Sequence, residues 1–367
     1  MKNRREYIVK ELKESNKPCI IYGTGKFAIC TAEYLLKNHV DIDCFCDSDR
    51  YYFEGKKIII SNDGEHRFRV INDKELNQIS SKYNILSGMI DYSFMTELKN
   101  RYPQSEIVDY LDVVPEHIME WQYIEENEKQ LSKVYDLLED EESRKVMESF
   151  IFARLTGNVE NLLKLNKNKE GGYGYDYDLL TLNNEDVVID GGSYVGDTIS
   201  EIQQYVKGNV KTIFAFEPDS VTFEKLKKNV EDNELIHLEN AGLWKDTSIL
   251  RFENAGTLGS KLKEDAENEV KVVSLDDYNR GGILENVTII KMDIEGSELN
   301  ALKGAEELLR NTMPKLAICV YHKNDDIFSI PLYIAALDFK GRKYKFYLRQ
   351  HSFSVEETVL YAIPADN

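Results

Sequence analysis

The chain has 367 residues, more than a single domain usually needs, so two domains joined by a connector are expected. Its formal net charge of -19, from 65 acidic and 46 basic residues, argues against binding to nucleic acid or to an anionic membrane. Five cysteines without metal-site spacing, a basic start with no apolar segment behind it, and no run near ~20 apolar residues indicate a reduced, cytoplasmic protein without a transmembrane segment.

Residues 1–115 are expected to form a small Rossmann-like α/β domain. An apolar strand at 19–22 leads into a G-x-G-x-x-A motif, in which Gly23 and Gly25 allow a sharp turn and the start of a helix. Asp47 follows the next strand, 19 residues after the alanine of the motif, where a ribose-binding acid is expected. These three residues are candidates for a second nucleotide site. Further strands are predicted at 42–46, 58–60, 85–86 and 107–108.

Three interpretations of this domain stay open. It resembles the half-Rossmann domains that accompany sugar-modifying enzymes, so a nucleotide or nucleotide-sugar is one expected ligand. A structural or oligomerising role, which would make the chain a homo-oligomer, is the second. The third is an NAD-dependent oxidoreductase, which the motif alone would favour, although no Tyr-x-x-x-Lys or cysteine pattern can be tied to hydride chemistry.

Residues 116–168 have no strand signal and are expected to form a helical connector. Apolar residues recur at helical spacing over 121–138 and again over 146–155. We expect these helices to pack on the C-terminal domain and to roof its cofactor. The Gly- and Tyr-rich segment that follows contains Tyr173 and Tyr175, which are candidates to contact cofactor or acceptor unless the segment is only an exposed linker.

Residues 169–367 are expected to form the second domain, which opens with a strand, a glycine-rich turn and a helix. The β-branched run at 187–189 suits a buried parallel strand, and the glycines behind it let the backbone come close to a nucleotide. A dinucleotide fold has glycine where this strand ends, because the diphosphate must approach the backbone. The chain has Asp190 there, and a carboxylate suits the ammonium and sulfonium of S-adenosylmethionine instead.

A second acid supports the same cofactor. Glu217 ends the next predicted strand, about 20 residues beyond the last glycine, and is well placed for the ribose hydroxyls. The alternative is that Asp190 only caps a helix and Glu217 is a solvated loop charge.

Strands and helices alternate through the rest of the domain, which predicts a doubly wound sheet closed by an antiparallel hairpin. Strands are predicted at 212–216, 236–238, 249–252, 270–275, 287–292, 315–320, 344–348 and 358–363, and helices at 197–206, 223–230, 299–309 and 332–337. Ligands of such sheets lie beyond the carboxyl ends of the strands, where Asp293 and His322 also fall.

Positive charge gathers in the hairpin region of this acidic chain. The residues concerned are Lys340, Arg342, Lys343, Lys345, Arg349 and His351. They predict a solvated sheet edge protected by lysines. The alternative is a site for an acceptor that bears phosphate or carboxylate, in which Arg349 would contact the acceptor but not the cofactor.

Five motifs, in order, carry a family resemblance. They are DGGSYVGDT at 190–198, FEPD at 216–219, SLDDY at 274–278, IIKMDIEGSELNALKGAE at 289–306 and YHK at 321–323. Through them, residues from about 170 to 363 resemble the FkbM family of S-adenosylmethionine-dependent methyltransferases. The GGSYV run departs from the more usual G-A-x-x-G pattern, which blurs the subfamily. The residues expected to bind the cofactor are Asp190, Gly191, Gly192, Ser193, Gly196, Asp197, Thr198, Glu217, Pro218, Ala241 and Asp293.

The resemblance implies O-methylation, commonly of sugars in glycan, polysaccharide or secondary-metabolite biosynthesis. Methyl transfer from a sulfonium is an in-line displacement, and an alcohol acceptor also needs a general base. Asp293, Glu295 and His322 are the candidate catalytic residues, because they stand on neighbouring strand-end loops. Their oxygen and imidazole donors could hold a divalent cation, but nothing in the spacing requires one and no metal site is predicted.

The sequence therefore predicts a two-domain α/β protein. Its expected function is S-adenosylmethionine-dependent O-methylation of a sugar, glycan or polysaccharide precursor. The alternative is a nucleotide-sugar-binding scaffold or regulatory protein whose methyltransferase-like domain binds cofactor poorly.

Overall fold

The computed structural model describes residues 3–48, 58–61, 64, 66–89, 92–167, 174–230, 233–252, 268–284, 286–352 and 354–365. The chain divides into two compact units. Unit 1 comprises Met1–Ile124, Ser149–Lys164 and Phe353–Val355, and unit 2 comprises Glu125–Glu148, Leu165–Ser352 and Glu356–Asn367. The helices of the predicted connector, α6 (Trp121–Leu137) and α7 (Glu141–Thr156), are each divided between the units. Among the described residues, no helix combines the length and apolar character that crossing a membrane would require.

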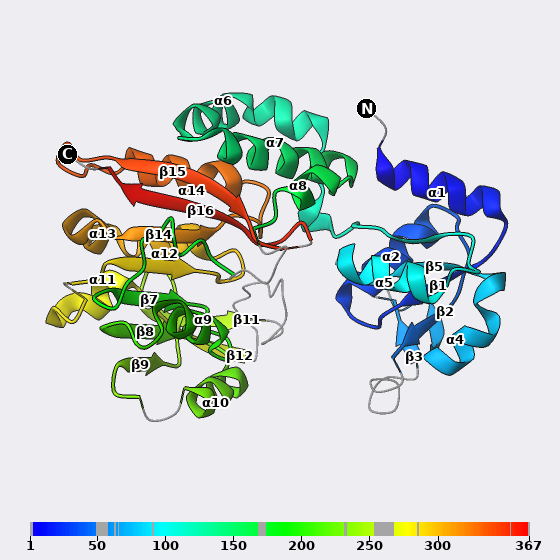
Figure 1. The fold of residues 1–367 in the computed structure, drawn as a ribbon, viewed down its shortest axis with the longest axis horizontal. Coiled ribbons are helices and arrows are strands. Elements are labelled where there is room, and N and C mark those ends of the chain that lie inside the picture. The colour runs from blue at the N-terminus through cyan, green and yellow to red at the C-terminus, as the bar shows by residue number, and fades with distance from the viewer. Residues whose placement is uncertain are drawn as a thin grey trace. The chain divides into compact units, whose positions relative to one another are not determined.

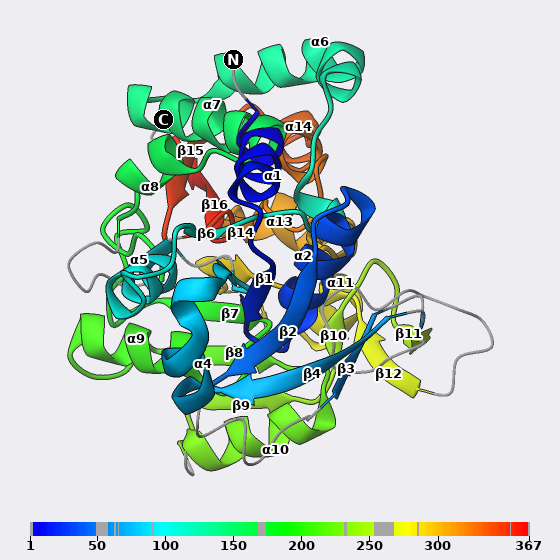
Figure 2. The ribbon, with the colours of Figure 1, turned by 90° about the vertical axis from the view of Figure 1, so that its right-hand side faces the viewer.

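Unit 1 is built on a six-stranded sheet with the order β3-β4-β2-β1-β5-β6, part of which Figure 2 shows. Every neighbouring pair is parallel except β3 and β4. The strands are β1 (Cys19–Tyr22), β2 (Ile42–Asp47), β3 (Ile58–Ile60), β4 (Arg67–Asn72), β5 (Asn84–Ser87) and β6 (Val108–Tyr110). The helices are α1 (Arg4–Ser15), α2 (Lys26–Lys37), α4 (Asp73–Ile79), α5 (Tyr92–Arg101) and α8 (Glu160–Lys164), with 3₁₀ turns η1 (Ser80–Lys82) and η2 (Pro115–His117). The predicted Rossmann-like character is confirmed.

Apolar residues fill both faces of this sheet. Cys19 and Ile21 lie in the core that contains α1 and α2, whereas Ile20 lies in the core that contains α4 and α5. Successive side chains of a strand point to opposite faces, so β1 must be apolar along its whole length. Cys44 and Cys46 are buried in the second core, where they pack as small hydrophobes.

The sequence patterns do not reveal α1, β4, α4 or α5. In α1 the buried residues are Arg5, Ile8, Val9 and Leu12, and charged residues occupy most of the other positions, so the apolar stripe is narrow. The helix is held instead by a cap, since the side chain of Asn3 accepts a hydrogen bond from the backbone N–H of Arg5 at 2.9 Å. With these elements the sheet has more strands than the half-fold expected from the sequence.

Unit 2 is built on a seven-stranded sheet with the order β15-β16-β14-β13-β7-β8-β9. Its strands are β7 (Val187–Gly191), β8 (Thr212–Phe216), β9 (Ile236–Glu239), β13 (Ile289–Met292), β14 (Lys315–Cys319), β15 (Tyr344–Gln350) and β16 (Thr358–Pro364). Its helices include α9 (Asp197–Val206), α10 (Ser220–Asn229), α11 (Leu275–Tyr278), α12 (Glu298–Lys303), α13 (Glu306–Thr312) and α14 (Asp326–Ala336). The 3₁₀ turn η3 (Asn279–Gly281) follows α11. Strand β16 runs antiparallel to both of its neighbours, β14 and β15, which confirms the predicted terminal hairpin (Figure 1).

Three features of unit 2 differ from the sequence-based expectation. The strands expected around 249–252 and 270–275 pair in a separate three-stranded sheet of β10 (Gly242–Leu243), β12 (Asn268–Val273) and β11 (Ser248–Phe252). The strand expected at 270–275, which is β12, ends early because Ser274 caps α11. The hydroxyl oxygen of Ser274 accepts a hydrogen bond from the N–H of Asp277 at 3.1 Å. The single helix expected at 299–309 is two helices separated near Gly304.

The first part of α7 and the end of α6 pack on the hairpin edge of the sheet, as expected for the connector (Figure 1). The Oγ of Ser143 accepts a hydrogen bond from the backbone N–H of Leu348 at 2.9 Å. Leu138, just after α6, forms an isolated parallel bridge with Phe346. These contacts satisfy backbone groups on the outer edge of β15 that an edge strand would otherwise expose.

Candidate active site

The turn between β7 and α9 contains three residues in the left-handed region of backbone conformation. Gly192, Tyr194 and Gly196 all have positive φ angles, of 75°, 47° and 90°. A Cβ atom on Gly192 would lie 1.8 Å from the carbonyl oxygen of Asp293, so the turn is pressed against the end of β13. The N–H groups of Gly192 and Ser193 both donate to the carbonyl oxygen of Phe216, at 3.0 and 3.1 Å. The turn is therefore fixed between the carboxyl ends of two neighbouring strands.

Asp190 lies beneath this turn, and its carboxylate faces Lys291 from β13. Asp190 is fully buried, and its Oδ1 is 3.0 Å from Nζ of Lys291. The same Nζ donates to the carbonyl oxygens of Gly191 and Gly192 at 3.3 and 2.9 Å. The structure thus offers the Asp190 carboxylate a protein cation in place of the cofactor ammonium expected from the sequence. The pair braces the turn from below.

The pKa of Lys291 shows which effect prevails at this pair. Burial lowers the pKa of the ammonium, but the charges of Asp190 and Asp293 outweigh burial and raise it. Lys291 therefore stays charged in the interior. The sequence analysis did not identify Lys291 as a site residue, because it considered only the acids of this motif. The pattern that could have indicated it is a single lysine in an otherwise apolar strand.

Glu217 follows β8 and its carboxylate holds the neighbouring loops. Its Oε2 accepts from the N–H of Tyr194 at 3.0 Å, and its Oε1 accepts from the N–H of Asp219 at 2.9 Å. Burial raises the pKa of Glu217 although these hydrogen bonds oppose the change. Each oxygen keeps a further acceptor position, so this carboxylate fits a pair of ribose hydroxyls better than Asp190 fits an ammonium.

The other residues expected at the cofactor surround the same turn. Ser193 is buried and its Oγ donates to the carbonyl oxygen of Asp190 at 2.8 Å. Asp197 is exposed at the first turn of α9, and Thr198 beside it is buried. Pro218 is half-buried and Ala241 is buried, at the ends of β8 and β9. All of the predicted cofactor residues therefore lie at or near the carboxyl ends of the strands.

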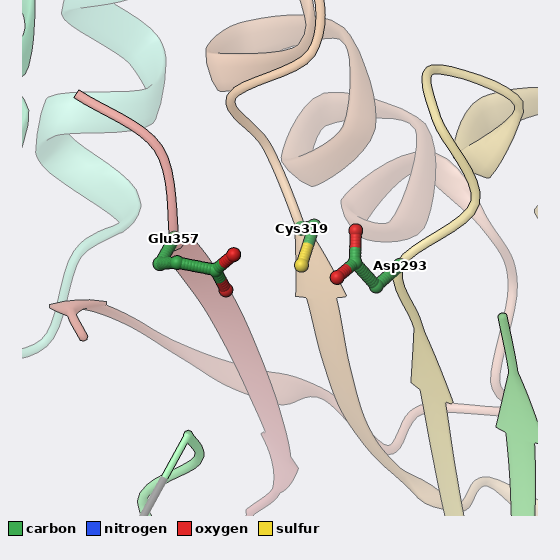
Figure 3. A group of neighbouring side chains, drawn as sticks. All are labelled: Asp293, Cys319 and Glu357. Atoms are coloured by element: carbon green, nitrogen blue, oxygen red, sulfur yellow. The ribbon is translucent and has the colours of Figure 1, made fainter. Parts of the chain in front are cut away.

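Asp293 follows β13 and forms the centre of a second group of side chains. The hydroxyl of Tyr321 lies 3.1 Å from Oδ1 of Asp293 and 3.3 Å from Oε1 of Glu357, so one phenol bridges two carboxylates. Figure 3 shows Asp293 and Glu357 directed toward Cys319 from two sides. Burial, with the charge of Asp293, raises the pKa of Glu357 to about 7. The position of Glu357, just before β16, was not predicted.

His322 follows β14 and is surrounded by acids. Its Nδ1 is 3.1 Å from Oε1 of Glu298, and its Nε2 is 3.4 Å from Asp293 and 3.5 Å from Glu295. Burial lowers the pKa of His322, but the charge and hydrogen bond of Glu298, with the other two acids, raise it to about 10. The imidazole is therefore a cation at neutral pH. A general base must be neutral or anionic, so the acids around His322 favour the form of the ring that does not accept a proton, and His322 stays a candidate catalytic residue.

Glu295 differs from its neighbours in exposure and backbone. Its side chain is 55% exposed, and its φ of 57° lies in the left-handed region that residues other than glycine rarely adopt. Although more than half of the side chain is exposed, protein atoms around the carboxylate partly remove it from water, and this desolvation, with the charges of Asp293 and Glu298, raises its pKa to about 7 although His322 lowers it.

Two sets of donors lie close enough together to hold a cation, with donor atoms within 4.8 Å of one another. They are Asp293 with Cys319 and Glu357, and Asp293 with Glu298 and His322. In the second set a cation would have to displace the proton that the surrounding acids favour on His322, and in the first set burial raises the pKa of the Cys319 thiol well above its usual range. We therefore describe these residues as an ion-paired network.

Two other side chains predicted to contact a ligand, those of Tyr175 and Arg349, are buried. Tyr175 is buried, with its ring 5.7 Å from Nζ of Lys291 and its hydroxyl 3.9 Å from Sγ of Cys319, and Tyr173 lies outside the described residues. Arg349 is neither solvated nor open to an acceptor. It is buried and pairs with Asp140 at 2.7 Å, so the basic character of the hairpin is partly structural.

The candidate nucleotide site of unit 1 is arranged as the motif predicts. Gly23 has a φ of 113°, and Gly25 caps α2 with no atom within 4 Å of where a Cβ would stand. The Oγ1 of Thr24 donates to Oδ2 of Asp47 at 2.7 Å, which joins the turn to the end of β2. The three predicted residues are therefore brought to one edge of the unit 1 sheet.

Comparisons with known proteins identify the C-terminal part. Residues 190–346 match the family model of the methyltransferase FkbM domain. This part of the chain is an FkbM methyltransferase domain. The crystal structure of methyltransferase FkbM from Methylobacillus flagellatus KT superposes with a TM-score of 0.66 at 21% identity, covering 97% of this chain and 93% of that chain. The two proteins therefore share their fold over both units.

A curated relative is similar over a shorter region. The hexuronic acid methyltransferase AglP of Haloferax volcanii is 27% identical over 132 residues, which are 35% of this chain. The match spans 53% of the relative, about half of its length.

Proposed function

We propose that the chain transfers a methyl group from S-adenosylmethionine to a hydroxyl oxygen of a sugar or glycan precursor. The proposal rests on one observation. The turn fixed by Gly192, the carboxylate of Glu217 and the acids around His322 all lie at the carboxyl ends of the strands of one sheet. The FkbM domain and the hexuronic acid specificity named for the Haloferax volcanii relative support methyl transfer and a sugar acceptor.

The residues at these strand ends form two groups, one suited to the cofactor and one to the acceptor. The turn and Glu217, on β7 and β8, would hold the nucleoside and amino-acid parts of the cofactor. The network of Asp293, Glu295 and His322, on β13 and β14, would face the acceptor. S-adenosylmethionine supplies the methyl group on a sulfonium leaving group when it is bound. The chain's own residues orient the acceptor oxygen, exclude water and take up its proton.

The test is calorimetric titration with S-adenosylhomocysteine, followed by transfer from labelled S-adenosylmethionine to a panel of sugars. We expect micromolar binding that Gly192→Ala abolishes, because an added Cβ would strike the Asp293 carbonyl. Gly281→Ala is the matched control, since a Cβ there would meet nothing within 4 Å. A wild type that binds no S-adenosylhomocysteine would favour the alternative, a scaffold or regulatory protein.

We further propose that unit 1 binds a nucleotide or nucleotide-sugar at Gly23, Gly25 and Asp47. The uncrowded backbone at Gly25 and the carboxylate of Asp47 at the end of β2 favour this ligand class. Titration with nucleotide-sugars and NAD tests it, with Asp47→Asn expected to weaken binding in unit 1 and leave S-adenosylhomocysteine binding unchanged.

A further inference from the structure

Both ring nitrogens of His322 face carboxylates. Nδ1 is 3.1 Å from Glu298, while Nε2 is 3.4 Å from Asp293 and 3.5 Å from Glu295. A neutral imidazole carries one N–H and one lone pair, and here the lone pair would face a negative oxygen whichever nitrogen held it. Only the doubly protonated ring places a donor toward each group of acids. With 8% of its side chain exposed, the ring has little access to water that could relieve such a conflict.

Glu298 is the residue that fixes this arrangement. It is fully buried at the start of α12, and its Oε1 also accepts from the N–H of Ile294 at 2.8 Å. The carboxylate is therefore anchored by the backbone of the same loop that carries Asp293 and Glu295. A buried carboxylate without a nearby cation is costly, because burial removes it from water. The negative charge of Glu298 and the positive charge of His322 therefore compensate each other as a buried ion pair.

Within the resulting network, Glu295 is the carboxylate best placed to receive a proton. Asp293 is already engaged by the hydroxyl of Tyr321, whereas Glu295 is exposed at the open side of the loop. The charged groups that face Glu295 come from the neighbouring elements. They are His322 after β14, Asp293 after β13, Glu298 on α12 and Glu356 before β16. Lys323, whose Nζ donates to the carbonyl oxygen of Gly296, lies beside the same loop.

We propose that Glu298 is a positioning residue that holds His322 as an imidazolium, and that Glu295, rather than the imidazole, accepts the proton of the acceptor hydroxyl. The proposal rests on the methyl transfer proposed above. The acceptor O–H proton passes to the carboxylate of Glu295 as the oxygen bonds to the methyl carbon. The C–S bond of the sulfonium breaks and its electron pair stays on sulfur, so sulfonium, alcohol and carboxylate become thioether, ether and carboxylic acid. His322 stays protonated throughout, and its charge faces the Glu295 carboxylate, 3.5 Å from Nε2.

The first experiment measures the protonation state of the His322 ring and does not depend on methyl transfer. In protein labelled with ¹⁵N-histidine, the ring signals that His322→Gln removes are followed from pH 6 to pH 9. We expect the wild-type ring to stay doubly protonated at pH 8, the Glu298→Gln ring to be neutral at that pH, and Glu298→Asp to restore the proton in part. A neutral wild-type ring at pH 8, or a protonated ring in Glu298→Gln, would overturn the role of Glu298.

The second experiment measures methyl transfer as a function of pH. Glu295→Gln is expected to lower kcat by about 10²- to 10⁴-fold, the usual range for a lost general base, with S-adenosylhomocysteine binding unchanged. Glu298→Gln removes the Glu298 charge, which raises the pKa of Glu295, and also the imidazolium charge, which lowers it. Because the effect of His322 is the larger of the two, the acidic limb of the kcat profile should move to higher pH. Glu269→Gln, an exposed acid on β12, is the control and should leave the profile unchanged.

The outcomes separate this proposal from the proposed function. Full kcat in Glu295→Gln, or activity that falls with a chelator and returns with Mn²⁺, would refute the role of Glu295. A wild type that transfers no methyl group to any sugar contradicts the proposed function, and the state of His322 is still decided by its ring signals.

Discussion

The buried pair of Asp190 and Lys291 makes a prediction whose size can be worked out from the structure. Lys291→Met removes the ammonium that lies 3.0 Å from Oδ1 of Asp190 and leaves that carboxylate fully buried beside an apolar side chain. Removing one partner of a buried ion pair costs about 3–5 kcal/mol, because the remaining charge is unpaired. The carbonyl oxygens of Gly191 and Gly192 also lose their donor, at about 1 kcal/mol each. We therefore expect Lys291→Met to lower the free energy of unfolding of unit 2 by about 5–7 kcal/mol.

The double variant Asp190→Asn with Lys291→Met separates the charge from the packing. With both charges gone, the unpaired carboxylate no longer exists, so the double variant should be more stable than Lys291→Met alone by about 2–3 kcal/mol. The matched control is Arg251→Met, which breaks an exposed pair with Glu269 at 2.8 Å and should cost at most ~1 kcal/mol.

Urea unfolding followed by tryptophan fluorescence measures these differences. The chain has two tryptophans, and Trp121→Phe in all variants leaves Trp244 as a reporter inside unit 2. The change in midpoint multiplied by the slope gives the change in free energy. A Lys291→Met variant within 1 kcal/mol of the parent, or a double variant whose cost equals the sum of the two single costs, would refute this account of the pair.

Three further predictions concern other parts of the chain. Arg5→Met should speed hydrogen exchange in α1 by at least tenfold and Lys10→Met should not, because buried Arg5 donates to two backbone carbonyls whereas Lys10 is exposed. Burial would raise the pKa of Asp140, but Arg349 lowers it to about 2. The stability lost in Asp140→Asn should therefore be constant above about pH 4 and vanish as the pH falls through 2 in urea titrations. Finally, KM should be at least tenfold lower for a neutral sugar than for its uronic acid, because the described residues around His322 carry more carboxylates than cations.

The sequence predicted the features that depend on local backbone chemistry. The glycines near 191–196 stand where the chain takes positive φ, and the strand that precedes them is apolar because it is buried on both faces. The acids Glu217 and Asp293 lie at strand ends, as expected for a doubly wound sheet. Such features are predictable because one short stretch of chain contains both the pattern and its cause.

The pairing of side chains from distant strands could not be predicted in the same way. Arg349 and Asp140 are 209 residues apart, and nothing in either local pattern shows that they meet. Glu357 reaches Asp293 only because the chain returns antiparallel as β16, which places the start of that strand beside the ends of the parallel ones. In each case the sequence shows the charge, while the fold decides its partner.

This distinction changes how substitutions at the site should be interpreted. From the motif alone, Asp190 would be the residue to mutate to test cofactor binding, and loss of binding in Asp190→Ala would be taken as loss of a contact. In the structure the same substitution leaves the ammonium of Lys291 unpaired beneath the turn, so binding would fail through the scaffold. Glu295→Gln instead removes a carboxylate that faces the acceptor in the proposed reaction. The three strand-end acids therefore need different experiments: stability for Asp190, cofactor affinity for Glu217, and proton transfer for Glu295.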